Sequence, residues 1–260
     1  MRVFDFDHAL ARTPGESIVH GLRAGDGPDP DYPAILREHR DYVAALTAAG
    51  LKVRVLDPLE AFPDSMFVED PALVFPQAAI LLRPGAPSRR GETEDLGRAL
   101  RDHFADVLPL EDGFADGGDV LVTPDAVFIG LSNRTDLAGA KALQRALASI
   151  GRRGVIARTP PGTLHLKSGA TLIDEGTVLA VPELAACGMF EGLRTLVAPE
   201  GELSGACVLR VNDVVLAGAQ FPRTLDLLAA HGLDVVPLSV AEIVKVDAGL
   251  TCMSLRWKAH

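Results

Sequence analysis

A pattern of two short apolar strands joined by a turn occurs four times in this chain, and this repetition limits the folds that the chain can adopt. Turn-forming residues interrupt β-branched and aliphatic runs each time, which is typical of a β-hairpin. The predicted hairpins cover 70–83, 119–130, 170–180 and 206–217. A predicted helix and a further strand usually follow, so the repeating unit is hairpin, helix, strand over roughly 40–50 residues.

Helical spacing and capping residues support the second part of this unit. Asp136 can cap a helix that carries Leu143 and Leu147 one turn apart. Pro222 can open another helix, because its fixed φ suits the first helical position. The third unit is shorter, and residues 182–192 leave room for a short helix at most.

A fifth unit is divided between the two ends of the chain. Residues 251–257 form a predicted last strand without a following partner, and residues 2–6 a predicted first strand without a preceding one. A helix over 33–50 and a strand over 51–56 come next, so joining the last strand to the first completes a unit of the same order. Closure into a ring leaves no exposed sheet edge. We therefore predict a five-bladed, pseudo-fivefold α/β propeller, forming one domain over 1–260 with its strands around the axis.

Composition narrows the class of protein. Hydrophobic residues make up 48% of the chain, enough for a sizeable core, and no run of 18 apolar residues predicts a membrane span. The net charge of −10 disfavours nucleic acid, whose phosphates need a basic surface, and fits a cationic ligand, although solubility alone also accounts for it. Three widely spaced cysteines suggest no disulfide framework, and the start of the chain lacks a signal-peptide pattern, so we expect a cytoplasmic protein.

Two reactive side chains stand at hairpin entrances, which would meet near the axis of a closed ring. Cys252 opens the predicted last strand and is a candidate nucleophile, whereas Cys187 and Cys207 are interpreted as core residues. His165 occupies the corresponding place in the third unit and can transfer a proton near neutral pH. A purely structural role stays open for both Cys252 and His165.

Carboxylates are concentrated at the same entrances, next to apolar strand segments. Turn or cap roles explain any one of them, but a shared pocket explains the set better, because clustered carboxylates need a cation. A guanidinium fits paired carboxylates in bidentate geometry, and arginines in nearby loops can bind a substrate carboxylate. The acids are Asp64, Glu69, Asp70, Asp116, Asp119 and Asp247, and the arginines are Arg89, Arg90 and Arg134. Spacings typical of zinc ligands do not occur, so we predict no metal site.

Motifs along nearly the whole chain resemble the dimethylarginine dimethylaminohydrolase family of guanidino-group-modifying enzymes. Among the matching pieces are Ala-Arg-Thr-Pro at 11–14, Phe-Pro-Asp-Ser-Met-Phe-Val-Glu-Asp-Pro at 62–71, Asp-Gly-Gly-Asp-Val at 116–120, Leu-His-Leu-Lys-Ser at 164–168 and the segment 246–256. The resemblance implies the pentein fold, a five-bladed α/β propeller. It also implies cofactor-free hydrolysis of Nω,Nω-dimethyl- or Nω-monomethyl-L-arginine to L-citrulline and the corresponding amine.

The resemblance implies catalytic roles for three residues. Cys252 would attack the guanidinium carbon and form a covalent thiouronium adduct. His165 would protonate the departing amine and then activate water, and Asp116 would orient His165.

Substrate-binding roles implied by the resemblance fall to a second set of residues. Carboxylates would hold the guanidinium or the α-amino group, arginines would bind the α-carboxylate, and a loop residue would cover the substrate. The set is Leu22, Asp64, Phe67, Glu69, Asp70, Arg89 and Arg134. Of these, Arg89 and Arg134 would clamp the α-carboxylate, Asp70 and Phe67 would shape the pocket, and Leu22 would lie on the lid.

Three other functions stay open at this point. A sister guanidino enzyme, either an arginine deiminase or an amidinotransferase, would use similar residues, whereas a non-catalytic binding propeller would not need Cys252, His165 and Asp116 together. A zinc enzyme is the most distant alternative. Ala248, which replaces a glycine common in the family, and the remodelled segment 21–31 leave the preferred arginine derivative open, and the oligomeric state is either monomer or homodimer.

Overall fold

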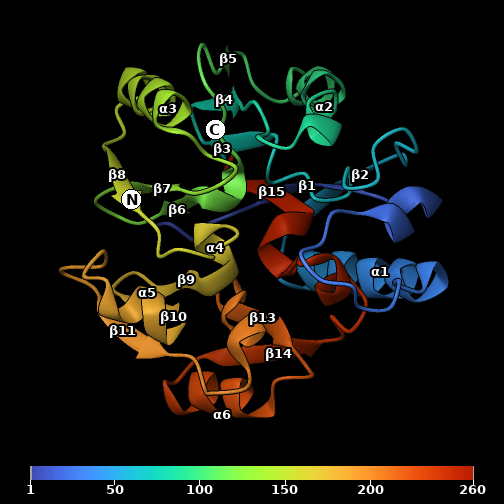
Figure 1. Ribbon diagram of the computed structural model, residues 1–260, viewed down its shortest axis with the longest axis vertical. Helices are drawn as coiled ribbons and strands as arrows, with labels where there is room; N and C mark the ends of the chain where they lie inside the picture. The colour runs from blue at the N-terminus through green and yellow to red at the C-terminus, as the bar shows by residue number, and fades with distance from the viewer. Residues whose placement is uncertain (1, 260) are drawn as a thin grey trace.

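The computed structural model describes residues 2–259, and its strands form five small sheets around one axis (Figure 1). In each sheet the first two strands pair antiparallel and the third runs parallel to the second. An outer helix connects the second strand of each blade to the third (Figure 1). The predicted five-bladed α/β propeller is confirmed.

Each blade takes consecutive strands, except for the blade that the two ends of the chain share. The sheets have the orders β15-β1-β2, β3-β4-β5, β6-β7-β8, β9-β10-β11 and β12-β13-β14. The strands are β1 (His8–Arg12), β2 (Lys52–Leu56), β3 (Ala72–Phe75), β4 (Ala78–Leu81), β5 (Val107–Pro109), β6 (Val120–Val122), β7 (Val127–Leu131), β8 (Gly154–Arg158), β9 (Ala170–Asp174), β10 (Thr177–Ala180), β11 (Arg194–Val197), β12 (Leu209–Val211), β13 (Val214–Gly218), β14 (Asp234–Leu238) and β15 (Ser254–Trp257).

Helices form where the capping signals predicted them. The connecting helices are α1 (Tyr32–Ala48), α2 (Glu92–Leu100), α3 (Leu137–Ser149), α5 (Pro182–Ala186) and α6 (Pro222–Ala230), and a single turn, α4 (Leu166–Gly169), precedes β9. The side chain of Asp136 caps α3 by accepting a hydrogen bond from the Gly139 N–H at 2.6 Å. Pro222 opens α6, and Gly232 follows its end with a φ of +85°, a left-handed conformation that favours glycine.

The ends of the chain close the ring as predicted, but with a different first strand. β1 pairs antiparallel with β15, aligning His8 with Trp257, and parallel with β2, aligning His8 with Lys52. The predicted strand over 2–6 is therefore wrong. Ala9 and Ala11 of β1 are fully buried in the sheet, whereas the more hydrophobic segment before β1, with Phe4 and Phe6, is only partly buried.

Two further element boundaries differ from the prediction. The last strand begins at Ser254 and not at residue 251, because residues 250–253 form the 3₁₀ turn η6 (Leu250–Met253). Cys252 thus lies on the turn before the strand. The four-residue spacing of Leu96, Leu100 and Phe104 also predicts a helix through Phe104, but α2 ends at Leu100, and Phe104 lies after the helix and packs on Trp257 at a ring-centroid distance of 5.2 Å.

The core is formed by helices packing against the sheets. In α3, Leu143 and Leu147 are fully buried in one cluster with Val127 and Ile129 of β7. Burial of each such leucine stabilises the fold by about 1.5–3 kcal/mol. Within residues 2–259, no helix is both long and apolar enough to cross a membrane.

Candidate active site

Short turns before the first strands of the blades converge at one end of the axis. They are η3 (Gly117–Asp119) before β6, α4 before β9 and η6 before β15. Beside these turns lies a cavity of about 130 Å³, lined by residues just before α4, by Cys252 of η6 and by the loop after β1. Eight of the ten predicted site residues line it, namely Leu22, Asp64, Phe67, Asp70, Arg89, Arg134, His165 and Cys252. The other two, Asp116 and Glu69, lie outside its lining.

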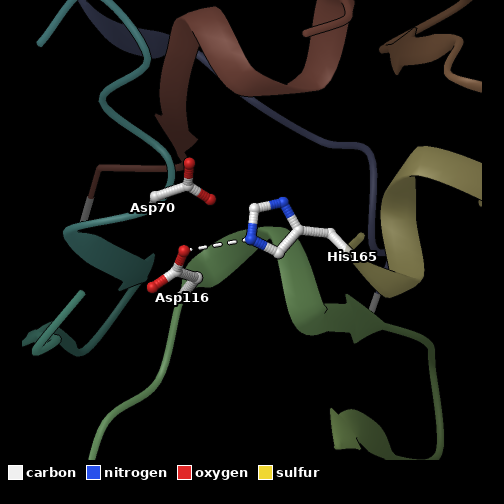
Figure 2. Close-up of side chains that lie close together, drawn as sticks. All are labelled: Asp70, Asp116 and His165. Atoms are coloured by element: carbon white, nitrogen blue, oxygen red, sulfur yellow. Dashed lines mark hydrogen bonds and ion pairs between the residues drawn. The ribbon is translucent and has the colours of Figure 1, made fainter. Parts of the chain in front are cut away.

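Asp116 lies behind His165 and fixes the imidazole. His165 Nε2 donates a hydrogen bond to Asp116 Oδ2 at 3.0 Å (Figure 2). Asp116 is fully buried, and its Oδ1 accepts a hydrogen bond from the Gly85 N–H at 2.8 Å. The Asp116 N–H itself donates to Thr135 Oγ1 at 3.1 Å. Because both carboxylate oxygens are engaged, Asp116 has a single orientation and holds one edge of the imidazole.

Asp70 lies beside Asp116, on the same side of the imidazole, and its charge affects the pKa of His165 (Figure 2). Burial alone lowers the pKa of His165, but the negative charge of Asp70, the hydrogen bond with Asp116 and the charge of Asp119 outweigh it and raise the pKa to about 9. His165 is therefore an imidazolium at neutral pH. Asp70, Asp116 and His165 place potential ligand atoms within 4.8 Å of one another, and the proton on the imidazolium offsets the charge of the two carboxylates.

The two glycines of the Asp-Gly-Gly-Asp motif are required by close packing. A Cβ on Gly118 would lie 2.7 Å from His165 Nδ1 and 2.9 Å from Asp70 Oδ1. A Cβ on Gly117 would lie 1.9 Å from the carbonyl oxygen of Glu69. The Gly118 N–H also donates to Asp70 Oδ1 at 2.9 Å, so the absence of a side chain lets the backbone itself position the carboxylate.

Asp119, which the sequence pattern placed at an entrance without a specific role, ties the His165 segment to the blade beside it. Its Oδ1 accepts from the Leu166 N–H at 3.0 Å, and its Oδ2 accepts from Ser132 Oγ at 2.6 Å and Thr135 Oγ1 at 2.7 Å. Burial raises the pKa of Asp119. Asp119 therefore supports His165 through the backbone.

Cys207 contradicts its interpretation as a core residue within a strand. It follows the 3₁₀ turn η4 (Leu203–Ala206), before β12, and its thiol hydrogen-bonds with that of Cys252. Thr251 Oγ1 lies 3.6 Å from Cys207 Sγ and 3.9 Å from Cys252 Sγ. A Cβ on Gly249 would lie 2.3 Å from Cys207 Sγ, so this glycine leaves room for the second thiol.

The two thiols ionise as a pair. The pKa of Cys207 is lowered to about 7, because the Cys252 thiol hydrogen-bonds to its thiolate, and the same hydrogen bond, with burial, raises the pKa of Cys252 well above its usual value. The pair therefore holds a single thiolate just above neutral pH, and a cation beside Cys252 favours the charge on that sulfur. Cys187, the other predicted core cysteine, is exposed, so that prediction is also wrong.

The two predicted arginines differ in how many partners they already have. The Arg89 guanidinium is buried, pairs with Asp70 and with Glu92 at 2.7 Å, and donates to the carbonyl of Phe67 at 2.9 Å. Burial alone lowers the pKa of Arg89, but Asp70 and Glu92 raise it well above the usual value, while burial raises the pKa of Glu92 to about 7. Arg134, in contrast, makes no ion pair within residues 2–259 and is only half-buried. Arg134 is thus the cation available to an incoming anion.

The loop after β1 lies over the cavity and is held by two carboxylates. Asp64 Oδ1 accepts from the Leu22 N–H at 2.9 Å, and Asp247 Oδ2 accepts from the Ala24 N–H at 2.5 Å. Burial raises the pKa of Asp64. Asp247 has a φ of 54°, the left-handed turn that brings its side chain to the loop. Leu22 therefore lies where a lid residue was predicted.

Glu69 is the predicted ligand that the structure places elsewhere. Its carboxylate pairs with Lys167 at 2.6 Å and Arg256 at 3.3 Å, away from the cavity that contains Cys252. Glu69 and Asp70 are consecutive residues of one turn, but Asp70 pairs with Arg89 whereas Glu69 pairs with Lys167. The Glu69 N–H donates to the Cys252 carbonyl at 3.2 Å, so Glu69 contacts the site through its backbone.

Comparison with known proteins identifies relatives along the whole chain. A family model described as eukaryotic N,N-dimethylarginine dimethylhydrolase matches residues 32–160. The dimethylarginine dimethylaminohydrolase of Pseudomonas aeruginosa is 36% identical over 97% of this chain and 100% of its own length. That of Streptomyces coelicolor is 36% identical over 95% of this chain and 96% of its own.

Solved structures agree with these sequence matches. A mutant of the P. aeruginosa enzyme complexed with citrulline has a TM-score of 0.94 at 37% identity, covering 97% of this chain and 100% of that one. The N-terminal domain of a cyanobacterial arginine dihydrolase shares the fold, with a TM-score of 0.85 at 16% identity over 98% of this chain and 99% of its own. The extent and identity of the first two sequence relatives place the chain in one family: it belongs to the dimethylarginine dimethylaminohydrolases.

Proposed function

We propose that this protein hydrolyses Nω,Nω-dimethyl-L-arginine or Nω-monomethyl-L-arginine to L-citrulline and dimethylamine or methylamine. The observation that carries the proposal is one cavity that holds a cysteine nucleophile, an imidazolium and carboxylates for a cation. A mutant of the P. aeruginosa relative has been crystallised with citrulline, the product of this reaction, and a dimethylarginine dimethylaminohydrolase 37% identical to this chain has been crystallised as an adduct with S-methyl-L-thiocitrulline.

The first half of the reaction uses the thiolate of the Cys252–Cys207 pair. A bound guanidinium draws the negative charge to Cys252, and its sulfur attacks the guanidinium carbon. His165, protonated in the free protein, donates its proton to the departing amine as the carbon–nitrogen bond breaks. General acid catalysis of this kind typically contributes ~10²–10⁴-fold to the rate. The product of this half is a covalent thiouronium adduct on Cys252.

The second half regenerates the thiolate. His165 has lost its proton and takes one from a water molecule, whose oxygen attacks the same carbon. The carbon–sulfur bond then breaks and returns its electron pair to Cys252, while the proton of the new hydroxyl is released to solvent, which leaves the neutral ureido group of citrulline. Asp116 holds His165 in one orientation throughout, so the same nitrogen serves as acid and then as base.

Substrate binding is divided between the two ends of the cavity. Asp64 and Asp70 hold the guanidinium, and Phe67 packs beside it. Asp64 can do so because only its Oδ1 is engaged, by the Leu22 N–H, and its Oδ2 has no hydrogen-bond partner in the described part of the chain. Arg134 binds the α-carboxylate directly. Arg89 holds Asp70 in place, because its own donors are already engaged.

The remaining features of the proposal concern the molecule as a whole. The five blades act as one catalytic domain over residues 1–260, without a cofactor, as a monomer or a homodimer. A cytoplasmic location fits the three cysteines, all of which are free thiols.

The experiment that tests the function is a citrulline-release assay with dimethylarginine, monomethylarginine and arginine, on the protein and on its Cys252→Ser variant. Citrulline from the methylated substrates, lost in Cys252→Ser, is the expected result. Citrulline mainly from arginine reassigns the protein as a deiminase. No citrulline from any of the three, with folded and reduced protein, rejects the proposal and favours a binding propeller.

A further inference from the structure

A second and larger cavity lies within the same ring of blades. Its volume is about 400 Å³, within the usual range for a site that binds a small molecule. None of the residues that line it lines the cavity containing Cys252. We refer to it as the leucine chamber, after the residues described next.

Equivalent leucines from the five blades form the wall of the leucine chamber. Each comes from the first strand of its blade, β3, β6, β9, β12 or β15, and is between 3% and 6% exposed. They are Leu73, Leu121, Leu172, Leu209 and Leu255. Phe75 and Trp257, two residues after the leucines of their strands, extend the same apolar surface. A wall of this kind suits an apolar body.

The floor of the chamber carries more positive than negative charge. Lys167 and Arg256 share one carboxylate, that of Glu69, and all three residues line the chamber. Their side chains are between 5% and 12% exposed, so water screens them little. Arg256 Nε and Glu69 Oε2 are buried without a hydrogen-bond partner in the described part of the chain. An unpaired N–H donor in a group with excess positive charge indicates a missing anion.

The outer part of the chamber is also more positive than negative. Arg2, Arg210 and Lys258 line it, with Asp5 as the acidic residue among them. Lys258 pairs with Asp5 at 3.0 Å, which leaves the two arginines as the excess charge there. An anion therefore meets favourable potential along its way from the entrance to the floor.

We propose that the leucine chamber is a binding site for a small carboxylate with an apolar body. The carboxylate lies at the floor, where it accepts a hydrogen bond from Lys167 Nζ beside the positive charge of Arg256. The apolar body lies in the ring of leucines, in contact with Trp257. The site is separate from that of the cationic amino acid, because the floor divides the two cavities.

Trp257 is the only tryptophan of the chain and provides a direct readout, since it lines the chamber. The intact protein is titrated with octanoate and with 3-phenylpropanoate, which distinguish a straight chain from an aromatic body, and with octan-1-ol as the uncharged match. A saturable change in tryptophan fluorescence is expected with at least one carboxylate. Its dissociation constant should be at least about tenfold below that of octan-1-ol, because hydrogen bonds to charged groups are worth roughly 1.5–3 kcal/mol.

Three variants separate the floor from the wall. Lys167→Met should weaken carboxylate binding about tenfold and leave octan-1-ol binding unchanged. Leu121→Phe, which fills the chamber, should weaken both ligands. Leu137→Phe is the matched control, because Leu137 is 51% exposed on α3 and lies outside the chamber. Far-ultraviolet circular dichroism checks that each variant is folded.

Three results would overturn the proposal. One is the absence of a saturable change with either carboxylate up to about 10 mM, a concentration well above the millimolar affinity of a weak site. Another is equal affinity for octan-1-ol and octanoate, which would leave an apolar chamber without recognition of the anion. The third is competitive displacement by dimethylarginine in the Cys252→Ser protein, which would place the carboxylate in the other cavity.

Discussion

The two cavities of this propeller are made from neighbouring segments of the same blades, and yet their chemistry is opposite. The leucine chamber is walled by equivalent residues, so the fivefold repeat is visible there side chain by side chain. Around the cavity with Cys252, corresponding turns carry different residues: a histidine before β9 and a cysteine before β15 line it, and an aspartate before β6 lies behind the histidine. Strand positions are constrained by packing against both neighbours, whereas the turns before them have room to differ. The repeat is therefore kept in the strands and lost at the turns.

Among changes to the cavity that contains Cys252, replacing His165 should have the largest effect on kcat. His165→Gln keeps a hydrogen-bonding side chain but cannot donate a proton to the amine, so kcat should fall by ~10²–10⁴-fold. The measurement is steady-state citrulline release together with rapid-quench detection of the amine. A full burst of amine in His165→Gln would show that His165 acts only in the second half of the reaction.

The pH profile tests whether the two titrating groups of the site act in opposite senses. Catalysis needs the thiolate, which forms as pH rises through the pKa of about 7 on the thiol pair, and the imidazolium, which is lost as pH rises through about 9. The profile of kcat/KM should accordingly be bell-shaped, with limbs near these values and about a tenfold change per pH unit beyond them. Absence of the upper limb up to pH 10 would contradict the role of His165 as the acid.

A single methyl group at Gly118 tests how closely the turn is packed around His165. Gly118→Ala brings a Cβ against both His165 and Asp70, so kcat/KM should fall by about tenfold or more, since a small misplacement of catalytic groups is costly. Gly25→Ala is the matched control, because a Cβ there meets nothing within 4 Å. Equal activity of the two variants would show that η3 can accommodate the extra methyl group without displacing His165.

Removing the second thiol should have a moderate effect. Cys207→Ala removes the thiol that ionises near pH 7, so the thiolate must form on Cys252, whose pKa is raised by burial, and the pH of half-maximal alkylation by iodoacetamide should rise by about one unit or more. The loss in kcat at saturating dimethylarginine should be smaller, because the bound substrate itself stabilises the thiolate. Cys207→Ser keeps a hydrogen-bond donor, so its pH of half-maximal alkylation should lie between those of the parent protein and Cys207→Ala. An unchanged pH dependence of alkylation in Cys207→Ala would show that Cys207 does not affect the ionisation of Cys252.

The smallest effect on catalysis is expected from a change in the leucine chamber. Leu172→Ala should reduce the free energy of unfolding by about 2–3 kcal/mol, at the low end for buried leucines because Leu172 already borders a cavity. Its kcat/KM should stay within about twofold of the parent value, because the floor separates it from Cys252. Denaturant titration and citrulline release measure the two quantities. A large loss of activity would show that the cavities are coupled.

The fold was predictable because each blade repeats its own pattern. Turn residues such as Asn212 and apolar runs on both sides mark every hairpin, and the split fifth unit follows from counting strands without partners. The first strand was misplaced because the segment over 2–6 is more hydrophobic than β1. Which of the two segments pairs with both β15 and β2 is decided only in the assembled sheet, where Ala9 and Ala11 of β1 are buried.

The candidate site was predictable only in part, for a related reason. Eight residues that line one cavity were identified from entrance motifs and from the resemblance to a family, and both depend on local sequence. Glu69 and Cys207 were misjudged. Which side of the floor the Glu69 carboxylate faces depends on Lys167 and Arg256, and whether Cys207 touches Cys252 depends on how two blades meet.

The sequence by itself determined the number of blades, the order of their elements and the types of reactive residue, because periodicity, turns and caps act over a few residues. The tertiary structure alone decided which side chains share a charge or a proton, as in the imidazolium of His165 beside two carboxylates and the paired thiols. Those properties depend on burial and on distances between segments far apart in the chain. The same holds for the leucine chamber, whose five residues are alike in sequence but form a site only when the ring is closed.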